Sequence, residues 1–76
     1  MYGVTILRND SKFESLIIAK NKEILLYKVT KFMSDNDYTF KDIGDFVSDF
    51  HLTYKGGNLC EYNYEFFTVL ITEDLS

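Results

Sequence analysis

The residues best placed to do chemistry are three aspartates spaced three and four positions apart, Asp42, Asp45 and Asp49. This spacing puts side chains on one face of an α-helix. Two more acids, Asp35 and Asp37, precede them. Carboxylates about one helical turn apart, roughly 5.4 Å, approximate the regular negative charge of a nucleic acid strand. We call Asp42, Asp45 and Asp49 the acidic ridge and predict that it occupies a protein cleft that otherwise grips DNA or RNA.

Two other interpretations of these acids are available. The first is a solvated helix face whose carboxylates lie near the positive N-terminal end of the helix dipole. The second is a calcium-binding EF-hand loop, because Asp35 and Asp37 would stand at its first and third positions. Such a loop needs glycine at position six and an acid at position twelve, where this chain has Phe40 and Phe46. We therefore predict no metal site.

Catalytic chemistry has little to draw on in this sequence. His51 and Cys60 are the only imidazole and the only thiol, which excludes zinc sites built from several Cys and His ligands. A Cys–His dyad is conceivable, but a small buried Cys60 and an exposed or helix-capping His51 are the simpler interpretations. No phosphate-binding or nucleophile-elbow motif occurs. We predict a protein that is not an enzyme and has no cofactor.

Composition favours one small domain over residues 1–76, with a core made dense by 17% aromatic residues. One cysteine excludes an internal disulfide, and no apolar run approaches the roughly 20 residues that span a bilayer. A secretory leader pattern is not evident, so we expect a cytoplasmic protein without membrane contact. Gly, Ala, Arg and Pro are scarce while Lys, Asn, Ile, Phe and Tyr are abundant. This bias is typical of AT-rich codons and suggests a bacterial or phage origin.

Charge is divided unevenly along the chain. Residues 1–33 carry six basic and three acidic residues, a net charge of +3, whereas residues 34–76 carry two basic and nine acidic residues, a net charge of −7. With a total of −4, direct binding to nucleic acid is disfavoured at physiological salt. The lysines in the first half are interpreted as a solvated face. The asymmetry points instead to partner proteins.

The elements that must position the acidic ridge begin with strands. Residues 2–8 alternate between two faces and are followed by an Asn-Asp-Ser turn signal at 9–11, which predicts a first strand. Residues 12–19 are read as a second strand in a hairpin with the first, although Ser11 and Glu14 also fit the capping box of a helix. Residues 61–72 are the richest in aromatic and β-branched types and predict one long core strand, apolar on both faces toward its end.

Two helices lie between these strands. Asn21 can cap a helix over residues 22–34, with a third strand as the alternative. Thr39 with Asp42 three positions later predicts a helix over 40–50, whose apolar stripe would be Phe40, Ile43, Val47 and Phe50. A short strand at 52–54 and a turn at 55–58 would then lead into the last strand.

Together these features predict an α+β domain: a small antiparallel sheet of three or four strands, with one or two helices packed on one face. We expect a non-enzymatic inhibitor or adaptor, encoded by a phage or mobile element, that binds a host protein of nucleic acid metabolism. Anti-CRISPR proteins and other nucleic-acid mimics share this size and acidity. The alternative is a regulatory or structural subunit that self-associates, as a homodimer for example, or joins a complex through its aromatic strand. The residues predicted to contact a partner are Asp35, Asp37, Asp42, Asp45, Asp49, Tyr62 and Tyr64.

Overall fold

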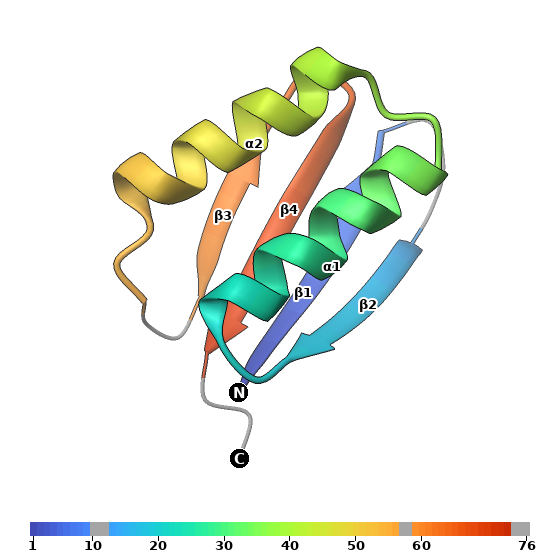
Figure 1. Ribbon diagram of the computed structural model, residues 1–76. Helices are drawn as coiled ribbons and strands as arrows, with labels where there is room; N and C mark the ends of the chain where they lie inside the picture. The colour runs from blue at the N-terminus through green and yellow to red at the C-terminus, as the bar shows by residue number, and fades with distance from the viewer. Residues whose placement is uncertain (10–12, 57–58, 74–76) are drawn as a thin grey trace.

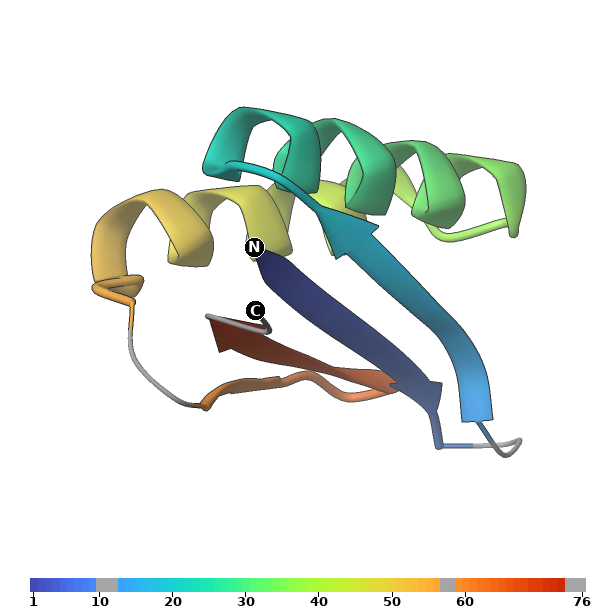
Figure 2. The same cartoon turned by 90° about the horizontal axis from the view of Figure 1, so that it is seen from below.

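The structure, a computed structural model, describes residues 1–9, 13–56 and 59–73 and is a two-layer α+β domain. In chain order the elements are β1 (Tyr2–Arg8), β2 (Phe13–Ala19), α1 (Lys22–Asp35), α2 (Phe40–Thr53), β3 (Cys60–Asn63) and β4 (Phe67–Glu73). Both helices cover the same face of one four-stranded antiparallel sheet, as the views in Figures 1 and 2 show. The predicted fold class is confirmed.

The strand order is β2-β1-β4-β3, with every neighbouring pair antiparallel. The predicted β1–β2 hairpin is present, and β1 pairs on its other side with β4, from Tyr2 opposite Glu73 to Arg8 opposite Phe67. Since α1 packs against β2 and β1, the first half of the chain builds one side of the molecule and the second half builds the other (Figure 1). The charge asymmetry of the sequence is therefore also an asymmetry in space.

Helix α1 begins and ends as its polar residues dictate. The Asn21 side chain accepts a hydrogen bond from the Ile24 N–H at 2.9 Å, which caps the first turn. At the other end Asn36 caps the helix, and Asp37 adopts a φ of 65°, a left-handed conformation that Asp tolerates better than most residues. The interpretation of residues 22–34 as a helix is confirmed, and the alternative third strand is wrong.

Helix α2 opens with the predicted capping box. The Asp42 N–H donates to Thr39 Oγ1 at 3.0 Å, and the Thr39 N–H donates back to the Asp42 carboxylate at 3.2 Å. The helix continues to Thr53, so the predicted short strand at 52–54 is wrong. Between Gly44 and Gly56 the sequence has no glycine or proline that would end the helix earlier. The Tyr54 N–H still donates to the Phe50 carbonyl at 3.1 Å, which closes the last turn.

The predicted long strand over 61–72 is also wrong, because the chain reverses within it. β3 and β4 form a hairpin, closed by a hydrogen bond of 2.8 Å from the Tyr64 N–H to the Phe67 carbonyl. A twelve-residue strand would be about 40 Å long at roughly 3.3 Å per residue, whereas the Cα atoms of the whole molecule extend over 31 Å. The turn at 64–66 keeps both halves in one compact sheet.

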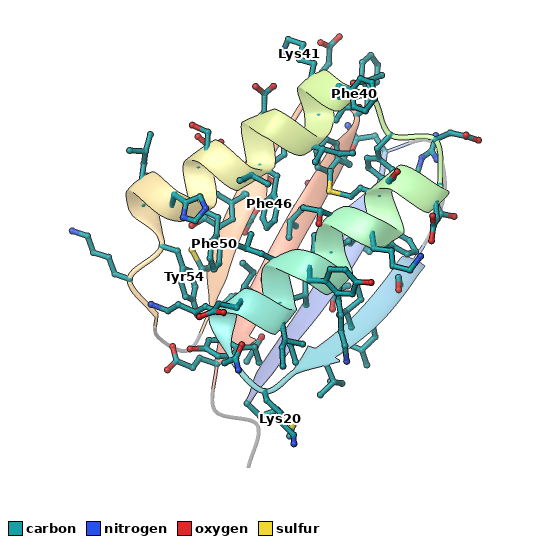
Figure 3. All side chains as sticks on the ribbon, in the orientation of Figure 1. Lys20, Phe40, Lys41, Phe46, Phe50 and Tyr54 are labelled. Carbon is teal, nitrogen blue, oxygen red and sulfur yellow. The ribbon has the colours of Figure 1, made fainter. Side chains whose placement is uncertain are left out.

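Aromatic rings fill the space between α2 and the sheet. Phe46 meets the ring of Tyr62 edge-on at 5.9 Å, and Phe50 stacks on Tyr54 at 4.7 Å. Figure 3 shows Phe46, Phe50 and Tyr54 along the inner side of α2 and its C-terminal end. The buried apolar residues of the core are Val4, Ile6, Ala19, Leu25, Val29, Met33, Phe46, Phe50, Tyr54, Tyr62, Phe67, Val69 and Ile71.

The apolar stripe of α2 is rotated from the predicted one. Phe46 and Phe50 are buried, Ile43 and Val47 lie at the margin of the core, and Phe40 is 93% exposed. Phe40 is the first residue of α2. At this end of the helix its ring lies beyond the layer of side chains that pack between α2 and the sheet. The prediction that Phe40 belongs to the core is wrong.

Candidate functional site

A groove of about 340 Å³ lies between the first turns of α2 and the β3–β4 turn. It is lined by Thr39, Lys41, Asp42, Asp45, Tyr64, Glu65 and Phe66. We call it the acidic groove, since three of these side chains are carboxylic acids and one is a lysine. Two members of the acidic ridge, Asp42 and Asp45, thus share a surface with Glu65 from the β-turn.

Each carboxylate of the acidic ridge has a partner within the molecule. Asp42 completes the capping box. Asp45 forms an ion pair with Lys41 at 2.9 Å, and Asp49 accepts a hydrogen bond from the Tyr64 hydroxyl at 2.8 Å. These contacts hold the carboxylates in fixed positions while leaving further lone pairs on each one to accept hydrogen bonds. The ridge is therefore both part of the fold and an ordered array of acceptors.

The two acids before α2 are placed differently from each other. Asp35 is in the last turn of α1 and forms an exposed ion pair with Lys31 at 3.2 Å. Asp37 lines a second hollow of about 120 Å³ together with Arg8, Tyr38, Asp42, Phe66 and Phe67. Because Asp42 and Phe66 line both hollows, Asp37 is at the same end of the molecule as the acidic groove. Asp35 lines neither hollow.

The two predicted tyrosines also differ. Tyr62 is 8% exposed, with its ring against Phe46 and its hydroxyl accepting from Thr53 Oγ1 at 3.1 Å, so its side chain belongs to the core. Tyr64 is half-buried, stacks on Phe67 at 4.6 Å and lines the acidic groove. Of this pair, only Tyr64 is placed where a partner could meet it.

Sequence reasoning missed two exposed phenylalanines at this end. Phe40 is 93% exposed and Phe66, in the β3–β4 turn, is 64% exposed. The helical spacing of Phe40 predicts a core position, and the predicted strand over 61–72 places Phe66 in the core as well. The cap at Thr39 makes Phe40 the first helical residue, which is a signal that its ring could lie at the margin of the packed layer. The polar Asn63 and Glu65 are a signal that the chain reverses near Phe66. Large apolar side chains left in water often mark an interaction surface.

Tyrosine ionisation links this region to stability. Burial and the neighbouring Asp49 carboxylate raise the pKa of Tyr64 well above its usual value, and burial and Glu73 do the same for the pKa of Tyr54. The folded state then holds these phenolic protons more tightly than the unfolded chain, in which the pKa of a tyrosine is about 10. The contribution of these two tyrosines to stability is therefore fully present below that pH, and it is lost as the pH rises toward their pKa values in the folded state.

We therefore expect the free energy of unfolding, measured with urea between pH 8 and pH 11, to fall steeply above about pH 10. Tyr64→Phe should flatten that fall while lowering stability at neutral pH through the lost hydrogen bond to Asp49. Tyr27→Phe is the matched control, because Tyr27 is exposed on α1. A pH profile of Tyr64→Phe that coincides with the wild-type profile would contradict this assignment.

His51 and Cys60 are the only imidazole and the only thiol in the sequence. His51 is exposed in the last turn of α2, and Cys60 is the half-buried first residue of β3. Within the described ranges, no three side chains of His, Cys, Asp or Glu gather closely enough to hold a metal ion. In the same part of the chain, neither helix has the length and apolar character to cross a bilayer.

Comparison with known proteins adds no relative: no protein-family model matches this chain, and neither the curated proteins nor the solved structures include a match.

Proposed function

We propose that this protein is a non-enzymatic inhibitor or adaptor that binds a nucleic-acid-handling host protein through the acidic groove. The observation that carries the proposal is the groove itself, where Asp42, Asp45 and Glu65 converge beside an exposed Phe66. Interfaces of this kind combine aromatic anchors with complementary charge.

Charge supports a basic partner. The acidic groove carries three carboxylates against one lysine, and Asp37 and Asp49 lie beside it on the same half of the molecule, which has a net charge of −7 in sequence. The opposite half is basic. Such a separation of charge steers the cationic cleft of a partner toward the acidic end of the molecule and raises the rate at which the two proteins associate.

The spacing of the acids supports a cleft for nucleic acid in particular. Along α2, Asp42, Asp45 and Asp49 rise by about 4.5 Å and 6 Å at roughly 1.5 Å per residue. A nucleic acid strand presents a phosphate about every 3.4 Å of helix axis. Fixed carboxylates at comparable intervals can pair with lysines and arginines that normally hold phosphates. A cytoplasmic location and a phage or mobile-element origin belong to this proposal.

A self-associating subunit is the second candidate, favoured by the sheet face that the helices leave open. Leu16 and Ile18 of the edge strand β2 are 60% and 40% exposed. They pair with Thr5 and Gly3 of β1 on that face. A homodimer through this face would show as a doubled mass in light scattering, and it would leave the acidic groove free.

The proposed function is tested by capture from a lysate of a low-GC bacterium. Immobilised wild-type protein should retain a nucleic-acid-binding protein at low salt and release it as salt rises toward 1 M, where the Debye length is about 3 Å. The isosteric variant Asp45→Asn with Glu65→Gln should lose most of that retention, because it removes two groove charges. Asp35→Asn with Glu23→Gln removes two acids on α1 and is the control. Equal capture by all three proteins would reject the acidic groove.

A further inference from the structure

The end of the molecule that carries the acidic groove also presents two bare aromatic rings. Phe40 precedes Lys41, which lines the groove, and Figure 3 shows both at the N-terminal end of α2. Phe66 comes from the adjacent β3–β4 turn and lines the groove as well as the second hollow. Asp42, Asp45, Glu65 and Phe66 thus line one groove, and the exposed Phe40 stands between Thr39 and Lys41, two further residues of its lining.

Neither ring is needed by the core. Phe40 is almost wholly in water, and Phe66 lies at a chain reversal between β3 and β4. A phenylalanine that could bury roughly 150–250 Å² but stays exposed keeps that apolar area for a partner. Two such rings at one end of a small domain are the usual composition of an interface centre, where aromatic residues contribute most of the binding energy.

The partner's chemistry follows from combining the rings with the acids. A duplex keeps its bases stacked inside and presents mainly phosphates, so a duplex mimic has no use for exposed rings. A single strand presents phosphates and unstacked bases together. Proteins that bind single strands match this with a basic groove and aromatic side chains on which bases stack, each stack contributing about 1–3 kcal/mol.

We infer that the cleft bound by this protein is one for single-stranded nucleic acid, with Phe40 and Phe66 taking the place of bases and Asp42, Asp45 and Glu65 taking the place of phosphates. This inference rests on the proposed function and narrows it. The rings supply stacking and the carboxylates supply charge, so the two contributions should separate in experiment. Removing rings should lower affinity at every salt concentration, whereas removing carboxylates should also reduce the salt dependence.

The test uses proteins that the wild type captures and the Asp45→Asn, Glu65→Gln variant does not. While bound, these captured proteins are challenged with a single-stranded oligo(dT) of about 30 nucleotides or with a duplex of about 30 base pairs. Both are longer than the roughly 4–16 nucleotides that one OB fold, a common single-strand-binding domain, covers. We expect the single strand to release them at concentrations at least about ten-fold below those at which the duplex does. This difference corresponds to about 1.4 kcal/mol.

The rings are tested with Phe40→Ser and Phe66→Ser, singly and together, against Tyr27→Ser, which removes an exposed aromatic ring from α1. Circular dichroism should show all of these variants folded. The double variant should bind at least about ten-fold more weakly, with the salt dependence retained. Release by duplex and single strand alike, or wild-type affinity in the double variant, would overturn the single-strand inference and leave the proposed function intact. Absence of any charge-dependent capture would overturn the proposed function itself.

Discussion

Replacing Phe67 with alanine should destabilise the folded protein by about 3–5 kcal/mol, enough to unfold most of a domain whose total stability is of the order of 5 kcal/mol. Phe67 is 1% exposed at the start of β4. Its ring stacks on Tyr64 and meets Tyr38 edge-on at 5.1 Å. Truncation would leave a cavity under both rings. Urea unfolding, followed by circular dichroism at pH 7, measures the effect.

Leu70→Ala is the internal control for Phe67→Ala. Both residues are in β4, and the sequence alone predicts that both are central to the core. In the structure Leu70 is half-buried on the open face of the sheet, opposite Thr5 and Glu61. Its truncation should cost less than about 1.5 kcal/mol, since little apolar area is lost. Equal losses at the two positions would mean that the open face is covered in solution.

The second large effect concerns binding. Glu65→Lys should weaken binding of the captured partner by about ten-fold or more, and adding Asp45→Lys should extend the loss to about one hundred-fold at low salt, because each reversal places a cation against a basic cleft. Glu65 and Asp45 both line the acidic groove, one from the β3–β4 turn and the other from α2. Asp42 is left unchanged, because its carboxylate completes the capping box of α2. Isothermal titration calorimetry at salt concentrations between about 0.05 and 0.5 M, where the Debye length falls from about 14 to 4 Å, measures this loss of affinity.

Glu23→Lys provides a charge-matched comparison for Glu65→Lys. It exchanges the same residue types and changes the net charge by the same amount, but Glu23 is exposed in the first turn of α1, on the basic half of the molecule. Its affinity should stay within about two-fold of wild type, since surface charges beyond a Debye length are largely screened. If both reversals weakened binding equally, total charge rather than the acidic groove would be responsible.

Local signals in the sequence were sufficient for most of the fold. Asn21 and the Thr39–Asp42 pair act within one helical turn, so their effect does not depend on the rest of the chain. The alternation in residues 2–8 likewise reports a strand directly. These features fix where α1, α2 and β1 begin, and the antiparallel sheet with helices on one face follows from their order.

The errors arose where tertiary packing decides. Residues 61–72 are rich in strand-forming types, so the polar Asn63 and Glu65 alone did not indicate the reversal that exposes Phe66. Phe40 has the helical spacing of a core residue but lies past the packed layer. For the candidate site, the spacing of the aspartates predicts the ridge on one helix face. Nothing local could show that Asp49 would accept a hydrogen bond from Tyr64 or that Glu65 would line the same groove as Asp45.

The central pairing of β1 with β4 has a consequence for the order of folding. These two strands are the middle of the sheet, yet they are separated by most of the chain, with Tyr2 opposite Glu73. Closing so long a loop costs entropy before any contact repays it. We therefore expect the core to close only after β4 has been synthesised, although the β1–β2 hairpin and both helices precede it in the chain. A chain truncated before β4 should then lack a stable core.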